Sequence, residues 1–231
     1  MNHVPIITVD GPSGTGKGTV CSYLTDWLGW HFLDSGALYR VLALAAQRHQ
    51  INSDDEMALA KLAENLNVEF KVMGAGALVD VILDDDVVTD AIRTEECGNA
   101  ASIIAPIINV RQALLGRQHA FQQAPGLIAD GRDMGTVVFP GADIKLFLTA
   151  SAEERAKRRY KQLKEKGISA NLRDRSAAIA ERDARDSSRS ASPLKPAKEA
   201  IVIDTSDLDI DAVMAKITTL VKKTISNLPE N

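Results

Sequence analysis

A glycine-rich stretch near the start of the chain, GPSGTGK at residues 11–17, has the residues needed to bind phosphate. It fits the pattern G-x-x-x-x-G-K, in which glycines let the backbone curl so that successive N–H groups point inward. A helix that begins at this loop adds its positive end, and Lys17 adds a full charge. We therefore predict a phosphate site formed by Gly11, Ser13, Gly14, Thr15, Gly16, Lys17, Gly18 and Thr19.

Two other interpretations of this stretch are weaker. A dinucleotide-binding fold has an acid about 20 residues on, near Asp34, but it requires G-x-G-x-x-G and does not call for Lys17. A glycine-rich turn without a ligand is disfavoured because the motif lies between a predicted strand and a predicted helix. Gly18 stands where Ser or Thr usually follows the lysine, and Thr19 comes one place later. This favours water-mediated Mg²⁺ coordination and leaves the protein ligands of the metal open.

Arginines and acids follow two other predicted strands. Arg40 comes after the strand at residues 31–34, and Asp130-Gly131-Arg132-Asp133 follows a buried strand. In an open parallel sheet, ligands bind at the carboxyl ends of the strands, where these residues fall. Each arginine alone could be a solvated surface charge, but their shared edge favours a functional role.

Residues 153–189 form a charged helical stretch with 12 Lys+Arg and 7 Asp+Glu. Its first part contains Arg155, Arg158 and Arg159. The spacing of Arg182, Asp186 and Arg189 puts these three on one helical face. A salt-bridged surface helix pair is the ordinary explanation for such a run. The preference for arginine, whose planar guanidinium suits phosphoryl oxygens, favours a lid over a phosphate site.

The elements that must position these residues alternate between strands and helices. Strands are predicted at residues 6–10, 31–34, 127–130, 144–148 and 200–204. A helix beginning at Lys17 and ending at Gly29 has five residues on one predicted face: Val20, Tyr23, Leu24, Trp27 and Leu28. A last helix carries Ile210, Val213, Ile217 and Val221 on one face. The alternation predicts an α/β fold with a parallel sheet covered by helices on both faces.

One segment breaks this alternation. Residues 68–72 and 78–83 alternate apolar with polar or small residues, and Gly74-Ala75-Gly76 lies between them. The pattern predicts two antiparallel strands joined by a turn. With the flanking helices they form a small appended subdomain at about residues 65–103.

The composition describes an ordinary globular protein. The 231 residues are 45% hydrophobic and 25% charged with a net charge of −4, which excludes a disordered chain and argues against nucleic-acid or membrane coating. Cys21 and Cys97 lie in apolar surroundings and are predicted to be buried thiols. The start of the chain lacks the basic region of a signal peptide. We expect a cytoplasmic, reduced protein.

Four motifs resemble those of bacterial cytidylate kinases, a branch of the nucleoside monophosphate kinases: GPSGTGKGT at 11–19, LDSGALYR at 33–40, IADGRDMGTVVFP at 128–140 and ERDARD at 181–186. The resemblance covers almost the whole chain. It implies a P-loop kinase with a five-stranded parallel sheet in the order 2-3-1-4-5, a small antiparallel-sheet insert, a helical lid and a monomeric state.

The same resemblance divides the chain into five parts. They are core with the phosphate loop at 1–64, monophosphate-binding insert at 65–103, core at 104–150, lid and nucleotide-binding helices at 151–190, and core strand and helix at 191–231.

The resemblance also implies a role for each matching residue. Ser35, Arg40 and Arg132 would hold the acceptor phosphate, and Ser102, Arg111 and Asp133 would read the cytosine edge. Arg182 and Asp186 would hold the sugar hydroxyls, with Arg189 near the phosphates. Asp130 is counted with these substrate-binding residues. Lys17 would bind the donor β- and γ-phosphates, and Arg158 would close over them. The expected catalytic residues are Lys17, Arg132, Arg158 and Arg189.

The chemistry agrees with these roles. An acceptor phosphate is largely ionised at neutral pH, its second pKa being about 6, so no strong general base is needed. Several cations and Mg²⁺ are needed instead, because two polyanions must be brought together. We expect transfer of the γ-phosphoryl group of ATP to CMP or dCMP.

Three alternatives remain. The first is a kinase for UMP or another small acceptor, and the second is an NTP-driven switch or binding module. The guanine motif Asn-Lys-x-Asp that a switch should show is not in the sequence. The third, a purely structural role, predicts no stabilisation by nucleotides.

Overall fold

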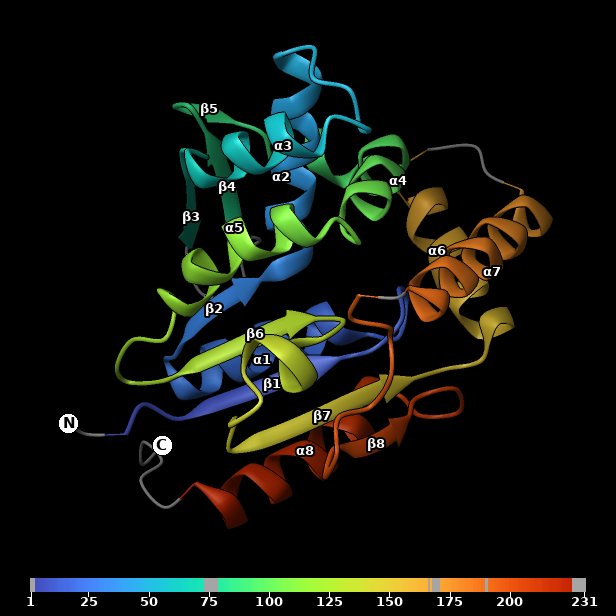
Figure 1. Cartoon of the computed structure of the whole chain (residues 1–231). Helices are drawn as coiled ribbons and strands as arrows, with labels where there is room; N and C mark the ends of the chain where they lie inside the picture. Colours follow the sequence, from blue (N-terminus) through green and yellow to red (C-terminus); the bar gives the residue numbers. More distant parts are fainter. Residues whose placement is uncertain (1–2, 73–78, 166, 168–170, 190, 226–231) are drawn as a thin grey trace. The chain divides into compact units, whose positions relative to one another are not determined.

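The computed structural model describes residues 3–72, 79–165, 167, 171–189 and 191–225. The chain divides into two compact units (Figure 1). The first combines Met1–Phe32 with Ala124–Asn231, and the second is Leu33–Gln123. Strand β2 (His31–Asp34) runs across the boundary in sequence. Each unit has its own hydrophobic core.

A five-stranded parallel sheet has the strand order β2-β6-β1-β7-β8, which confirms the predicted 2-3-1-4-5 order. Its other strands are β1 (Ile6–Asp10), β6 (Leu127–Gly131), β7 (Ile144–Thr149) and β8 (Ile201–Asp204). Strand β1 pairs in parallel with β6 on one side and β7 on the other, and all five of its residues are buried. This explains its nearly continuous apolar sequence, since a central parallel strand has no solvent-facing side.

Helices α1 (Lys17–Leu28) and α8 (Ile210–Thr224) share the core of the first unit with the sheet. Helix α1 ends at Gly29, whose left-handed φ of 63° confirms the predicted stop. The predicted apolar face of α1 is correct at Val20, Leu24 and Leu28, which are buried. It is wrong at Tyr23, which is 45% exposed, because this side chain lies at the margin of the face.

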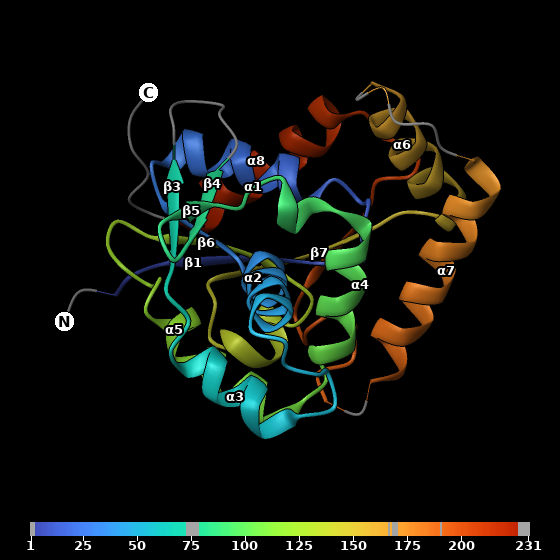
Figure 2. The same ribbon diagram turned by 90° about the horizontal axis from the view of Figure 1, so that it is seen from above.

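Helices α6 (Ala152–Glu165) and α7 (Leu172–Ser188) pack against each other in the same unit (Figure 2). They correspond to the charged stretch that the sequence predicts as helical. Both are strongly polar over most of their length.

The second unit contains α2 (Ser35–Arg48), α3 (Glu56–Glu64), α4 (Glu95–Ile104) and α5 (Ile108–His119). Its antiparallel sheet consists of β3 (Val68–Val72), β4 (Val79–Leu83) and β5 (Asp86–Val87). The predicted pair of antiparallel strands is confirmed, and β5 adds a third. The turn predicted at residues 74–76 lies outside the described residues. Cys97 in this unit and Cys21 in α1 are both buried, as predicted.

A π-helical turn, Met134–Val138, follows β6 and has no signal in the sequence pattern. Its wider bonding is seen in the bond from Val138 N to Asp133 O at 3.2 Å and in that from Phe139 N to Met134 O at 2.6 Å. Such turns are rare and occur frequently at functional sites. Among the helices of the described residues, none has the length and apolar character required to span a membrane.

Candidate functional site

The glycine-rich loop connects β1 to α1 and needs glycine at defined positions. Gly11 has a φ of +146°, and a Cβ there would lie 2.0 Å from the carbonyl oxygen of Leu148. Gly14 and Gly16 also have positive φ, at +83° and +92°. Only glycine adopts these conformations at low energy, so the loop can curl tightly before the helix begins.

Lys17 is the first residue of α1 and is buried. Its Nζ donates to the carbonyl oxygen of Pro12 at 2.9 Å and lies 4.0 Å from Oδ1 of Asp130, at the end of β6. Burial and, to a smaller extent, the nearby charge of Arg132 lower the pKa of Lys17 to about 8, although Asp130 acts in the opposite direction. The structure therefore brings the lysine, Asp130 and Arg132 together at the loop.

Thr205, just after β8, holds the loop through a hydrogen bond. Its hydroxyl donates to the carbonyl oxygen of Thr15 at 3.1 Å, and Thr15 Oγ1 donates to Pro12 O at the same distance. Arg158 from α6 donates to both the hydroxyl and the carbonyl oxygen of Thr205, and to Glu154. The predicted site residue Arg158 thus reaches the loop through Thr205.

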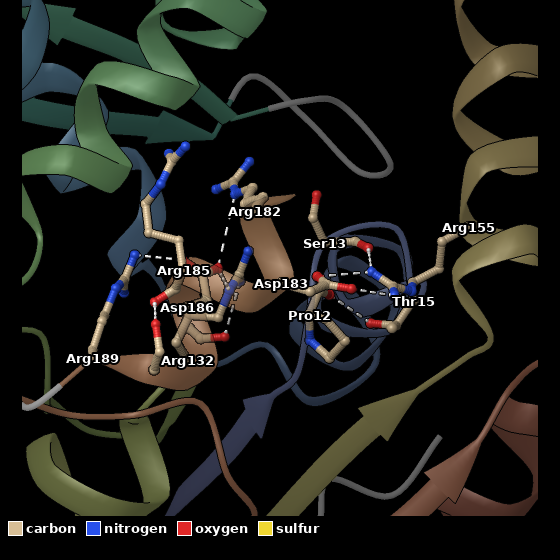
Figure 3. A network of polar contacts seen from close by, with 12 residues as sticks. Pro12, Ser13, Thr15, Arg132, Arg155, Arg182, Asp183, Arg185, Asp186 and Arg189 are labelled. Carbon is tan, nitrogen blue, oxygen red and sulfur yellow. Dashed lines mark hydrogen bonds and ion pairs between the residues drawn. The ribbon is translucent and has the colours of Figure 1, made fainter. Parts of the chain in front are cut away.

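Arg155 is a loop contact that the sequence did not single out as a site residue. It is 4% exposed and donates to Ala150 O at 3.0 Å and to Ser13 O in the loop at 3.2 Å. Its guanidinium also forms a two-pronged ion pair with Asp183 of α7 (Figure 3). One arginine of α6 therefore joins the phosphate loop to α7.

Three arginines surround a single buried carboxylate, that of Asp186 (Figure 3). Nε of Arg132 is 3.1 Å from Asp186 Oδ2, Nε of Arg182 is 3.8 Å from the same oxygen, and Arg189 binds Oδ1. Burial raises the pKa of Asp186, but the three guanidinium charges outweigh it and hold that pKa below its ordinary value. The predicted shared face of Arg182, Asp186 and Arg189 is confirmed by these contacts.

Asp133 is 5% exposed and stands immediately before the π-helical turn. The two amides that follow it, of Met134 and Gly135, donate to the two carboxylate oxygens of Asp10, each at 2.8 Å. Asp10, the last residue of β1, is a second residue that the sequence analysis missed. A charged residue closing an otherwise apolar strand was the available signal.

Ser35 and Arg40 lie on α2, in the second unit. Ser35 is buried and its hydroxyl donates to Gln118 Oε1 at 2.7 Å. Arg40 donates to the carbonyl oxygens of Ile92 and Thr94, at 2.7 and 3.2 Å. Both side chains are thus held in fixed positions by their own unit.

Ser102 and Arg111 belong to α4 and α5 of the same unit. Ser102 is 3% exposed. The guanidinium carbon of Arg111 lies 6.0 Å from the centroid of the ring of Tyr39, the residue before Arg40. Arg111 also donates to Ala105 O at 3.2 Å. The packing of α4 against α2 places Ser102 and Arg40 on neighbouring helices.

The predicted site residues therefore form two sets. The structure brings one set together in the first unit: the loop residues with Lys17, Asp130, Arg132, Asp133, Arg158, Arg182, Asp186 and Arg189. The other set, Ser35, Arg40, Ser102 and Arg111, belongs to the second unit.

A parallel sheet of order 2-3-1-4-5 with a glycine-rich loop and a lysine after its central strand defines the class of P-loop proteins. Within that class, residues 7–223 match the family model described as cytidylate kinase. The chain belongs to the cytidylate kinase family.

Individual relatives agree with this assignment. The cytidylate kinase of Aeromonas hydrophila subsp. hydrophila is 55% identical over 98% of this chain and 98% of its own. That of Nitrosococcus oceani is 58% identical over 93% and 95%. The crystal structure of an uncharacterized protein from Eubacterium ventriosum shares the fold, with a TM-score of 0.50 at 12% identity over 96% of this chain and 99% of its own.

Proposed function

We propose that the protein transfers the γ-phosphoryl group of ATP to CMP or dCMP, giving ADP and CDP or dCDP. One observation carries this proposal: arginines from the end of β6 and from α7 converge on Asp186 in the same compact unit as the phosphate loop. Membership of the cytidylate kinase family supports the choice of CMP over other acceptors.

Phosphoryl transfer depends on positioning and charge rather than on a strong base. The acceptor phosphate is already ionised at neutral pH, with a second pKa of about 6. A cation about 4 Å from a phosphoryl oxygen contributes roughly 4 kcal/mol at an effective dielectric constant of about 20. Several guanidinium groups can therefore offset the repulsion between the two nucleotides and stabilise the charge of the transition state.

On the donor side, the amides of the glycine-rich loop would bind the β-phosphate, and Lys17 would bind the β- and γ-phosphates. Arg158 would close over the transferred group. Its present bonds to Thr205, which itself supports the loop, keep its guanidinium at the loop. α6 and α7 would act as the lid that excludes water from the reacting phosphoryl group.

The residues at the loop fit Mg²⁺, which accompanies ATP in kinases. Over the described part of the chain, no group of three or more His, Cys, Asp or Glu could hold a metal by itself. Mg²⁺ usually keeps several waters and binds through one or two carboxylates and the substrate phosphates. Asp130 would provide the carboxylate, and Thr19 a hydroxyl through water. The ion would neutralise charge that develops on the transferred group.

On the acceptor side, Ser35, Arg40 and Arg132 would bind the phosphate of CMP. Guanidinium groups suit this role because they form paired hydrogen bonds to phosphoryl oxygens. Arg40 is already held by two carbonyl oxygens, which reduces the entropy lost on binding.

The sugar would be held by Arg182 and Asp186, with Arg189 near the phosphates. Because three arginines lower the pKa of Asp186, its carboxylate stays ionised and can accept hydrogen bonds from sugar hydroxyls.

The base would be read by Ser102, Arg111 and Asp133. Cytosine offers an amine donor beside a ring-nitrogen acceptor, which match the carboxylate of Asp133 and the guanidinium of Arg111. Uracil reverses both polarities and would leave buried groups unpaired, so a site of this kind discriminates strongly against UMP.

A coupled assay with ATP and a panel of nucleoside monophosphates tests the proposed function. We expect CDP or dCDP as product, with CMP or dCMP used far better than UMP. Release of free phosphate without a phosphorylated nucleotide would instead indicate an NTP-driven switch.

The same assay tests the base-reading role of Asp133. Asp133→Ala should raise KM for CMP roughly 10- to 100-fold, because a hydrogen bond to a charged group contributes about 1.5–3 kcal/mol. ATP binding should change little, and the exposed residue Asp207 provides the control variant Asp207→Ala. Equal losses for CMP and ATP would refute this role.

A further inference from the structure

Asp10 directly precedes the phosphate loop, but its side chain bonds to a different segment, the turn after β6. Asp10 precedes Gly11 and is 3% exposed. Its Oδ1 accepts from Met134 N and its Oδ2 from Gly135 N, both at 2.8 Å. These two amides directly follow Arg132 and Asp133, which the proposed function assigns to the phosphate and the base of CMP.

The bonds of Asp10 complete one end of the π-helical turn. At that end the carbonyl oxygen of Asp133 accepts from Val137 N at 2.9 Å and from Val138 N at 3.2 Å. The first amides of any helical turn have no partner within the turn. Asp10 supplies that partner for Met134 and Gly135, and an ionised carboxylate is a stronger acceptor at a helix N-terminus than a neutral side chain.

We propose that Asp10 is a positioning residue for the CMP site: its carboxylate fixes the backbone after Asp133 and so orients Asp133 and Arg132 toward the substrate. This role rests on the proposed function. Asp10 itself would not touch CMP. Its effect passes through the two amides, which it holds in place.

The phosphate loop does not depend on this carboxylate. The backbone of Asp10 is paired with Gly131 of β6 and with Phe147 of β7. The loop that follows is held by donors to its carbonyl oxygens, from Thr205 to Thr15 O and from Arg155 to Ser13 O. Removing the side-chain carboxylate therefore leaves the anchors of the ATP loop in place and removes only the anchor of the turn.

A carboxylate at this position has an unfavourable environment, which argues that it is kept for its contacts. Burial, with a smaller contribution from the charge of Asp133, raises the pKa of Asp10 from 3.8 to about 6, although the two amides and Lys17 oppose that rise. An apolar residue would be easier to bury at the end of β1, but it could not accept from the two amides.

Gly135 shows independently that the turn must lie close to Thr8 and Asp10 of β1. A Cβ on Gly135 would lie 2.9 Å from Oγ1 of Thr8 and 3.4 Å from Oδ2 of Asp10. An alanine there would push the turn away from Asp10 without changing the carboxylate. Gly135→Ala is therefore a second way to loosen the same contact.

Steady-state kinetics of Asp10→Asn tests the proposal. The amide has nearly the same shape but only one acceptor oxygen, so one of the two backbone amides loses its partner. We expect KM for CMP to rise at least tenfold, while KM for ATP stays within twofold. Equal increases in both KM values, or an unchanged KM for CMP, would overturn the positioning role.

Thr8→Val is the matched control, because Thr8 is buried on the same strand and touches the same turn. Its hydroxyl has no hydrogen-bond partner within the ranges that the structure describes, and valine has the same shape. Both KM values should remain unchanged in this variant.

Gly135→Ala should reproduce the selective rise in KM for CMP, and it decides the question if Asp10→Asn does not fold. A Gly135→Ala enzyme with the wild-type KM for CMP would then refute the proposal. Failure of the wild type itself to phosphorylate CMP would refute the proposed function instead, so the two failures are distinguishable.

Discussion

Two buried carboxylates of the first unit, Asp10 and Asp186, are stabilised in different ways. Asp186 is surrounded by three arginines, which outweigh its burial and lower its pKa. Asp10 receives two backbone amides, which do not outweigh burial, so its pKa rises to about 6. The ionised form of Asp186 is therefore favoured by folding, whereas the ionised form of Asp10 is disfavoured.

The raised pKa of Asp10 predicts a pH dependence of stability. Its contribution to the free energy of unfolding is fully present below about pH 3.8 and is lost as the pH rises through about 6. The loss amounts to about 3 kcal/mol, at 1.36 kcal/mol per pKa unit. The difference in unfolding free energy between wild type and Asp10→Asn should fall by most of this amount from pH 4 to pH 7.

Urea denaturation at constant ionic strength measures this difference. Thr8→Val keeps Asp10 and exchanges one side chain that does not titrate for another, so its difference from the wild type should not vary with pH. A constant difference for Asp10→Asn as well would show that Asp10 titrates near its ordinary pKa.

At the scale of elements, α6 and α7 are joined to the phosphate loop by Arg155. Its guanidinium donates hydrogen bonds to Ser13 O in the loop and to Asp183 in α7. Arg182 and Asp186 lie on either side of Asp183 in the chain. A shift of this arginine would therefore affect both the loop and the arginine cluster on Asp186.

We predict that Arg155→Met destabilises the protein and weakens ATP binding. Breaking a buried ion pair costs about 3–5 kcal/mol, and the 25% exposure of Asp183 places the expected loss at about 3 kcal/mol. KM for ATP should rise because Ser13 O loses a donor. Urea denaturation and initial rates at varied ATP measure the two effects.

Lys157→Met is the control for that variant. Lys157 pairs with Glu153 on the exposed side of α6, where ion pairs contribute little. Stability and KM for ATP should both stay near the wild-type values. An Arg155→Met enzyme as stable as this control would contradict the joining role.

Helix α4 contains a glycine that makes room for Arg40. A Cβ at Gly98 would lie 2.8 Å from Nη2 of Arg40. Gly98 is one helical turn from Ser102, so the guanidinium lies over the face of α4 that carries this serine. The glycine is thus explained by the position of Arg40, an arginine that we propose binds the substrate.

Gly98→Ala should therefore impair CMP binding without destabilising the helix. Alanine is favoured over glycine inside a helix by up to about 1 kcal/mol, so stability should hold or rise. Displacement of Arg40 should raise KM for CMP severalfold. Gly116→Ala in α5, where the added Cβ meets open space, should leave KM for CMP unchanged. Similar KM values for the two variants would contradict this explanation.

At the scale of the whole molecule, positive charge is concentrated in one part of an acidic chain. The net charge is −4, yet residues 153–189 carry +5. Local cations can attract polyphosphates while the overall charge stays negative, which favours small phosphorylated ligands over nucleic acid as partners.

Nucleotides should stabilise the protein against heat. A ligand that binds only the folded state at 100 times its Kd adds about 2.7 kcal/mol. In a chain of this size that corresponds to a rise in Tm of roughly 5–10 °C. We expect such a rise with ATP and with CMP in thermal scans, and a much smaller one with GMP. A Tm that no nucleotide changes would support a purely structural role.

Much of the fold could be predicted from local patterns. The strands of the parallel sheet are short and mostly apolar, with β2 the least so. The loop that follows β1 is a continuous motif in which glycine is required because Gly11, Gly14 and Gly16 have positive φ. Tyr23 was misplaced because helical periodicity gives the direction of a side chain but not the width of the surface that covers it.

The sequence alone determined the sheet order, the phosphate loop and the arginine-rich helices, because these depend on composition and spacing within short segments or on family resemblance. The tertiary structure decided which residues of these segments form hydrogen bonds and ion pairs with one another. Asp10 is 124 positions from Met134, and Arg155 is 142 positions from Ser13. Contacts between such distant residues leave no periodic trace in the chain, and their geometry depends on packing that only the folded protein defines.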